Sequence, residues 1–426
     1  MCSRFFLRGV LLSFSLISAG LLISVPGLRA EDLTPIEQLG KNIFFDERLS
    51  INQNQSCPAC HGPAVGWTGP ISIVNAGGTV YEGSIPGRFG DRKPPSAAYA
   101  TQSPVLHFER RGELWLGGNF WDGRATGAKL GNAAADQAQG PFLNSAEQAL
   151  RDSACVVYRV CTANYPLVSL TSVWGLAACT INWPADIVGA CGVEGPPLGL
   201  SSADRAKSDA AYNSIALSVA AYEASSEVNS FTSKYDLSLR GLAVLSPTER
   251  KGFSLFVGKG RCSRCHPAGG PGALFTDFSY DNLGIPKNPA NPVYATVPGF
   301  VDLGLGGFLR SAGYSSTVYQ PEMGKVKVPT LRNVDKRPTP EFVKAFGHNG
   351  YFKSLKQIVH FYNTRDVLPV CSPGSPSEGI TCWPPPEFPG NVNRQELGNL
   401  GLSDDEENAI IEFLKTLSDG HTPRRP

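Results

Sequence analysis

The runs CPACH at residues 57–61 and CSRCH at residues 262–266 share the pattern Cys-x-x-Cys-His. In this pattern both thiols bond covalently to a haem and the histidine binds its iron, so each run predicts a c-type haem. A zinc site built from both Cys-x-x-Cys pairs is the competing interpretation, and it leaves each following histidine without a role. The predicted haem-binding side chains are Cys57, Cys60, His61, Cys262, Cys265 and His266.

The segments that precede the two motifs repeat each other. LTPIE at residues 33–37 and LSPTE at residues 245–249 each supply a Thr or Ser N-cap, a Pro in the first helical position and a Glu that completes a capping box. Gly40 and Gly252 occupy equivalent positions in the helices that follow. A capped helix followed by Cys-x-x-Cys-His therefore occurs twice, and this duplication predicts two similar haem domains.

Length and composition bound the fold class. At 426 residues the chain exceeds an average single domain, and we assign residues 31–236 to an N-terminal and residues 237–426 to a C-terminal haem domain. Hydrophobic residues make up 42% of the chain, which excludes a disordered protein. The net charge of +1 offers no basic surface for nucleic acid. Because strand patterns are nearly absent, we predict a mostly α fold with two cytochrome c-like domains and long loops.

Residues 1–30 have the pattern of a secretory signal peptide. Arg4 and Arg8 form a basic start, an apolar run follows from Val10 to Ile23, and a small-residue cleavage site ends at Ala30. A membrane anchor is the alternative interpretation. Since no later run is long enough to span a bilayer, we expect an exported, periplasmic protein without a stable membrane span.

Six cysteines of the mature chain lie outside the haem motifs. They fall in three close pairs, Cys155/Cys161, Cys179/Cys191 and Cys371/Cys382. An oxidising compartment favours disulfides, and pairing between sequence neighbours is the simplest arrangement, although the sequence does not decide the connectivity. Four of these cysteines make residues 152–200 a disulfide-tied insertion.

Helical periodicity predicts helices at residues 145–151, 204–225, 353–364 and 404–417, whereas residues 62–119 have the composition of loops around the first haem. In the helix at 353–364, Tyr362 shares the apolar face with Ile358, and His360 points away. From this pattern alone, Tyr362 is either a core aromatic or an iron ligand.

Several motifs besides the haem sites occur in a specific order. They are FWDGR at 120–124, the segment from Gln137 through Gly140-Pro141 to Glu147, KVPTLRN at 327–333 and GHNG at 347–350. Together with the haem motifs they resemble the bacterial dihaem cytochrome c peroxidase/MauG family, and the resemblance covers residues 33–420. It implies two covalently bound haem c groups.

The resemblance bears on the distal ligand of the second haem. In that family this ligand lies on the helix after the GHNG motif, and it is Met in the peroxidases and Tyr in MauG. The corresponding residue here is Tyr362, so the resemblance favours an iron ligand over a core aromatic. Met323 lies away from this position, and His348 belongs to the GHNG motif itself.

The first haem departs from the family peroxidases that need reductive activation. Those peroxidases place a distal His in the loop before an Arg-Asn-x-Pro motif. Here the loop at residues 81–90 has no His, and the motif reads RKPP at residues 92–95, which implies an open iron site. His107 follows the motif as the nearby candidate ligand. Lys93 stands where the family has an Asn that reaches a calcium ion, so its ammonium can substitute for the metal and calcium is in question.

The resemblance also implies roles for the segment between the haem motifs. Hydrogen peroxide would react at the N-terminal haem with Glu147 as general acid–base, and Gln137 and Pro141 would line the pocket. Trp121 would carry electrons between the haems. Without the resemblance, Trp121 is equally a core aromatic and Glu147 a solvated acid.

Three functions follow from these expectations. The first is MauG-like oxidation of a residue on a periplasmic partner protein, which Tyr362 and the missing distal His favour. The second is a cytochrome c peroxidase that takes electrons from a small cytochrome or cupredoxin. The third, a dihaem electron carrier without catalysis, has no use for an open iron site or for Glu147.

Overall fold

The computed structural model describes residues 32–422. The predicted signal peptide lies outside these residues. Within them, no helix combines the length and the apolar character needed to cross a membrane.

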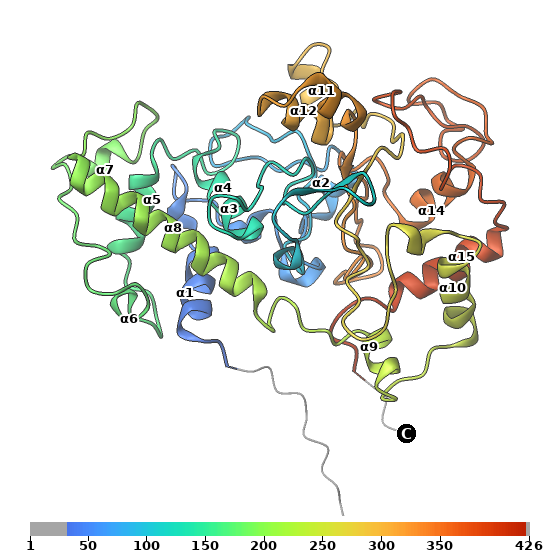
Figure 1. Cartoon of the computed structure of the whole chain (residues 1–426), viewed down its shortest axis with the longest axis horizontal. Coiled ribbons are helices and arrows are strands. Elements are labelled where there is room, and N and C mark those ends of the chain that lie inside the picture. Colours follow the sequence, from blue (N-terminus) through green and yellow to red (C-terminus); the bar gives the residue numbers. More distant parts are fainter. Residues whose placement is uncertain (1–31, 423–426) are drawn as a thin grey trace, which may run out of the picture. The chain divides into compact units, whose positions relative to one another are not determined.

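The chain is mostly helical with long connections (Figure 1). The helices before residue 230 are α1 (Pro35–Phe44), α2 (Ser72–Ala76), α3 (Ala133–Ala138), α4 (Gly140–Leu143), α5 (Ser153–Cys161), α6 (Leu170–Trp174), α7 (Ile187–Ala190) and α8 (Ser202–Ala224). Those that follow are α9 (Lys234–Leu239), α10 (Pro247–Val257), α11 (Val293–Thr296), α12 (Gly304–Ser311), α13 (Ser316–Tyr319), α14 (Leu355–Thr364) and α15 (Asp404–Lys415). This confirms the predicted mostly α class.

Strands are short in the described part of the chain. β1 (His107–Glu109) pairs antiparallel with β2 (Leu114–Leu116), and β3 (Tyr280–Asp281) pairs antiparallel with β4 (Val326–Lys327). The second pair joins the segment after the second haem motif to the KVPTLRN segment. It therefore holds these two segments side by side.

The repeated helix start forms as predicted. Capping boxes close on Thr34 in α1 and on Ser246 in α10. α1 packs against α8, and α10 packs against α15 (Figure 1). A Cβ on Gly40 would lie 1.8 Å from the Ser218 carbonyl oxygen, and one on Gly252 would lie 1.9 Å from that of Ala409. The two glycines match because each lets one helix touch the backbone of another.

Each half of the chain has its own hydrophobic core. The first core gathers α1, α5 and α8 around residues such as Phe44 and Ile215. The second gathers α10, α14 and α15 around Phe256 and Phe413. Residues 32–422 nevertheless pack as one unit, so the domain boundary near residue 236 stays a prediction from sequence.

Disulfide pairing between sequence neighbours was wrong for two of the three bridges. The structure joins Cys155 to Cys191 and Cys161 to Cys179, one loop nested inside the other. Cys155 and Cys161 both lie on α5, and six residues of helix separate them by about 9 Å along the axis. The bridged Cα atoms are 5.4 and 5.6 Å apart. The prediction was right for Cys371–Cys382, whose partners are 11 residues apart in one loop.

One predicted helix is also wrong. Residues 145–151 form turns, and the short helix α4 lies before them. The Asn144 side chain accepts a hydrogen bond from the Ala146 amide, and Ala149 has a left-handed backbone with φ of 59°. Both features stop a helix. The predictions at 204–225, 353–364 and 404–417 are confirmed by α8, α14 and α15.

Candidate functional site

The first haem motif forms a single 3₁₀ turn, Cys57–Ala59, after which His61 turns into the protein. The Nδ1 atom of His61 lies 3.2 Å from the Trp67 carbonyl oxygen. A carbonyl only accepts, so Nδ1 carries the proton and Nε2 is left with its lone pair. Burial lowers the pKa of His61, which keeps the ring neutral. A neutral imidazole held this way is a metal ligand with a fixed tautomer.

The second motif repeats this arrangement. It forms the 3₁₀ turn Cys262–Arg264, and the Nδ1 atom of His266 lies 2.7 Å from the Phe275 carbonyl oxygen. Burial lowers the pKa of His266 as well. Each motif therefore presents one neutral nitrogen beside two thiols.

The four motif cysteines are the ones outside disulfides among the cysteines that the structure describes. Burial raises the pKa of Cys60 and of Cys262 to about 12, so both stay thiols. Paired free thiols next to a histidine nitrogen are the groups that hold a haem c. The residues present therefore fit two covalently bound haems.

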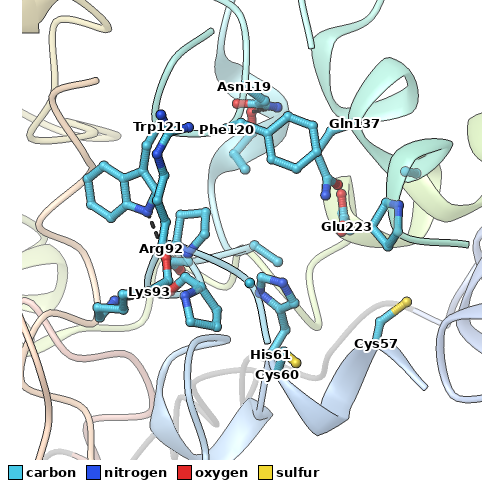
Figure 2. A pocket seen from close by; sticks show the side chains of 18 of the residues that line it. Cys57, Cys60, His61, Arg92, Lys93, Asn119, Phe120, Trp121, Gln137 and Glu223 are labelled. Atoms are coloured by element: carbon cyan, nitrogen blue, oxygen red, sulfur yellow. Dashed lines mark hydrogen bonds between the residues drawn. The ribbon is translucent and has the colours of Figure 1, made fainter. Parts of the chain in front are cut away.

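A large cavity opens beside the first motif. It encloses about 1750 Å³, counting its open mouth, and both halves of the chain line it. His61 and Cys57 enter from one wall, and Phe120 and Gln137 from another (Figure 2). The cavity brings together the residues that the sequence analysis assigned to the first haem and to the segment between the motifs, namely Cys57, Cys60, His61, Trp121, Gln137, Pro141 and Glu147, whereas Cys262, Cys265, His266 and Tyr362 do not line it.

Glu147 lines this cavity from the turn after α4. Burial raises the pKa of Glu147, while Asn144 and Arg124 act in the opposite direction. The Asn144 amide donates a hydrogen bond of 2.7 Å to Oε1. One oxygen of the carboxyl group is thus held by a hydrogen bond, and the group binds a proton more tightly than an exposed Glu does.

Trp121 is buried and connects the two halves of the sequence. Its indole Nε1 donates to the Lys93 carbonyl at 2.7 Å (Figure 2), and its own carbonyl accepts from the Lys327 amide at 2.8 Å. Its ring lies 6.5 Å from the ring of His348. The indole is thus held on one side by the RKPP segment and on the other by the KVPTLRN and GHNG segments.

At the expected calcium position the residues do not fit a calcium ion. Lys93 brings a positive charge, and its Nζ donates to the Thr68 hydroxyl and the Pro94 carbonyl, both at 3.0 Å. Burial lowers the pKa of Lys93 to about 8. The Lys93 amino group thus uses oxygens that a calcium ion would require.

Tyr362 lies on α14 and is partly buried against the second core. Burial raises the pKa of Tyr362, and the Cys262 and Cys265 thiols raise it further. Tyr362 and Cys262 pack against the same core, so the phenol lies near the second haem motif. His360, on the same helix, instead lies 2.9 Å from a Glu407 oxygen on α15.

The remaining candidate ligands lie elsewhere. His107 is exposed on β1, with its Nδ1 2.8 Å from the Val105 carbonyl, and is absent from the cavity lining. His348 is buried beside Trp121. Met323 packs against α12 through its backbone near Gly306.

Sequence reasoning missed Glu223, a second carboxyl group in the cavity. It lies on α8, one helical turn after Val219, which also lines the cavity. Burial raises the pKa of Glu223 to about 8, and its charge raises the pKa of Cys57 further. The sequence carries no signal for it, because only the structure shows that Val219 and this face of α8 line the cavity.

A buried cluster of ion pairs supports the part of the cavity lining that contains Trp121. Arg92 donates from Nη1 to Asp122 at 2.6 Å and from Nε to Asp302 at 2.7 Å. Arg92 and Asp122 come from the first half of the chain and Asp302 from the second. The cluster fixes the FWDGR segment that carries Trp121.

Comparisons with known proteins agree with this site. The family model described as di-haem cytochrome c peroxidase matches residues 35–243. The methylamine utilization protein MauG of Paracoccus denitrificans is 32% identical and covers 94% of each chain. Cytochrome c551 peroxidase of Nitrosomonas europaea is 25% identical, covering 96% of this chain and 92% of its own.

A solved structure is similar over most of the chain. The diheme peroxidase BthA of Burkholderia thailandensis has a TM-score of 0.70 and 27% identity, covering 91% of this chain and 87% of its own. Similarity of sequence and structure thus extends well beyond the two haem motifs. The protein belongs to the di-haem cytochrome c peroxidase/MauG family and is a haem oxidoreductase that uses hydrogen peroxide.

Proposed function

We propose that the protein is a MauG-like enzyme, which uses hydrogen peroxide to oxidise a residue on a periplasmic partner protein. The observation that carries this proposal is the lining of the first cavity. Among the residues that the structure describes, His61 is the one histidine that lines it, and no methionine does. The first iron would keep an open face, where peroxide reacts without prior reduction.

The haems, when bound, supply the redox chemistry. The chain supplies proton transfer, through Glu147. Its carboxylate takes a proton from the incoming peroxide and returns it to the departing oxygen as general acid–base. Asn144 holds one carboxyl oxygen at 2.7 Å and leaves the other free for this transfer.

Trp121 and Tyr362 are proposed to serve the second haem. Trp121 is the aromatic ring fixed between the two halves, which suits electron transfer from one haem site to the other. Tyr362 would bind the second iron through its phenolic oxygen, because it packs against the same core as Cys262 of the second haem motif. A hard oxygen ligand favours the oxidised metal.

The alternative is a cytochrome c peroxidase that takes electrons from a small cytochrome or cupredoxin. Relatives named cytochrome c peroxidase, such as that of Denitromonas iodatirespirans, are 24% identical over 93% of this chain. A dihaem electron carrier is disfavoured, because it would not need two buried carboxyl groups in a cavity beside the first haem motif.

One titration tests the proposal. Hydrogen peroxide is added to the purified, fully oxidised protein, and visible and near-infrared absorption is followed. We expect a long-lived species with a near-infrared band, formed without a reductant, and we expect Tyr362→Met to lose it. If the protein reacts only after one haem has been reduced, the alternative function, an ordinary cytochrome c peroxidase, is supported instead.

A further inference from the structure

We propose that Trp383 and Tyr351 carry oxidising equivalents from the second haem site to the surface at the disulfide-closed loop 371–382. This inference rests on the proposed function and deepens it, because it names the way out of the protein. The partner it implies is a protein that gives up electrons at this loop.

The inner part of the route begins at Tyr362, which packs against the same core as Cys262 of the second haem motif. Its ring centroid is 6.3 Å from that of the next residue, Phe361, and Phe361 is 5.0 Å from Trp383 in an edge-on contact. Phe361 and Trp383 are almost fully buried, at 0% and 2% exposure. The indole is therefore reached from the haem side through one ring.

The outer part runs through a second phenylalanine. Phe352 lies 6.2 Å from Trp383 and 5.0 Å from Phe361. It lies 4.9 Å from Tyr351, which is only partly buried. Edge-on and tilted contacts at these distances are ordinary for packed aromatic rings, and here they form an unbroken chain towards the surface.

Tryptophan and tyrosine differ from phenylalanine in their redox chemistry. Indole and phenol lose an electron far more readily than a phenyl ring, so Trp383 and Tyr351 are the residues that become oxidised, and the phenylalanines only separate them. Trp383 donates from Nε1 to the Thr364 hydroxyl at 3.0 Å, which holds its proton in place.

Tyr351 has a proton acceptor already in contact. Its hydroxyl donates to Oε1 of Glu378, on the loop 371–382. When Tyr351 loses one electron inward, its phenolic proton passes to the Glu378 carboxylate, and a neutral tyrosyl radical remains. Hydrogen peroxide is the oxidant, since it takes up two electrons and two protons to give two waters. Each peroxide therefore allows two such single-electron steps.

The loop holds these partners in a fixed arrangement. The Cys371–Cys382 bridge closes it directly before Trp383, and the Trp383 amide donates to the Pro369 carbonyl at 3.1 Å. The Gly374 amide donates to the second Glu378 oxygen at 2.6 Å. Glu378 is thus positioned by the loop to accept the tyrosyl proton.

A second aromatic cluster in this half of the chain lacks these features. It joins Phe253, Phe256, Phe275 and Phe413 to Tyr235. The Tyr235 hydroxyl donates to the Ala268 carbonyl, which cannot take a proton. That cluster therefore serves as packing, whereas the one at α14 combines an indole with a phenol bonded to a carboxylate.

The test compares Trp383→Phe and Tyr351→Phe with two matched controls. Trp115→Phe removes a buried indole from a separate small core. Tyr165→Phe removes a phenol that also donates to a carboxylate, Asp46 Oδ2 at 2.7 Å. Each oxidised holoprotein is mixed with hydrogen peroxide, without a partner. Decay of the near-infrared band, electron paramagnetic resonance of frozen samples and peptide mass spectrometry are measured.

We expect both route variants to form the near-infrared species at the wild-type rate and to lose it several-fold more slowly. Tyr351→Phe should lack the tyrosyl radical signal, and oxidised peptides from this loop should disappear. The controls should match the wild type. Decay, radical signal and peptide oxidation that are the same in all variants would overturn the route.

Failure of the proposed function has a different signature, because the wild type itself would form no species without prior reduction. In that case the same variants are compared for the rate at which an external donor protein reduces the second haem. Slower reduction in both route variants would support the route with electrons flowing inward. Unchanged rates would overturn it.

Discussion

Replacing Glu147 by Gln isolates the proton-transfer role of this side chain. Gln has the same shape as Glu, and its side-chain oxygen can still accept the 2.7 Å hydrogen bond from Asn144. The cavity lining and the turn after α4 should therefore keep their form. Only the capacity to take up and return a proton is lost.

The size of the effect follows from that role. A positioned general acid–base contributes roughly 10²–10⁴-fold to a reaction rate, which corresponds to about 2.7–5.5 kcal/mol of activation free energy. Since Glu147 has one oxygen fixed by Asn144 and is shielded from solvent, we expect Glu147→Gln to slow the peroxide reaction by at least about a hundredfold.

Stopped-flow absorption of the oxidised holoprotein mixed with peroxide measures this rate. The base form of Glu147 is the active one, so the rate falls as the pH drops through its pKa. Because burial raises the pKa of Glu147, this fall should begin at a higher pH than for an exposed Glu, near about 4.3. Replacing Arg124 by Gln removes a charge that lowers the pKa of Glu147 and should move the fall higher still.

Glu194→Gln is the matched control, since Glu194 is an exposed carboxylate of the same half, paired with Arg88. It should react at the wild-type rate. A Glu147→Gln protein that reacts within a few-fold of the control would refute the general acid–base role. The role would also be refuted if the rate fell at the same pH in the wild type and in Glu147→Gln.

Further expectations concern stability and metal content. Asp236→Asn leaves the fully buried Arg332 side chain without the carboxylate to which it is paired at 2.9 Å. Denaturation with guanidinium chloride should show that the free energy of unfolding falls by about 3–5 kcal/mol. A fall below ~1 kcal/mol, the range of surface pairs, would contradict this. Gly252→Ala pushes a methyl group onto the Ala409 carbonyl, 1.9 Å away, and should cost ~1–3 kcal/mol or more, measured in the same assay. Dialysis against a calcium chelator should leave the spectrum and the peroxide reaction unchanged, because the Lys93 ammonium already uses the local oxygens; recovery that depends on added calcium would contradict this.

The sequence was sufficient wherever a feature depends on neighbours along the chain. Capping boxes at Thr34 and Ser246 and the two haem turns are local, because each needs only a few consecutive residues. The matched glycines, Gly40 and Gly252, revealed the duplication for the same reason. The motif order also brought Glu147 and Trp121 forward as candidates, and the cavity contains both.

Other features depend on contacts between distant segments, and only the tertiary structure decided them. The nested bridges of Cys155 and Cys161 arise because one helix holds both thiols too far apart to join each other. Glu223 belongs to the site because one face of α8 lines the cavity, and no sequence motif marks this residue. The aromatic chain from Tyr362 to Tyr351 forms because the closed loop brings Trp383 against α14. Local patterns fix the turns and caps, whereas packing sets which side chains share a cavity or a ring contact.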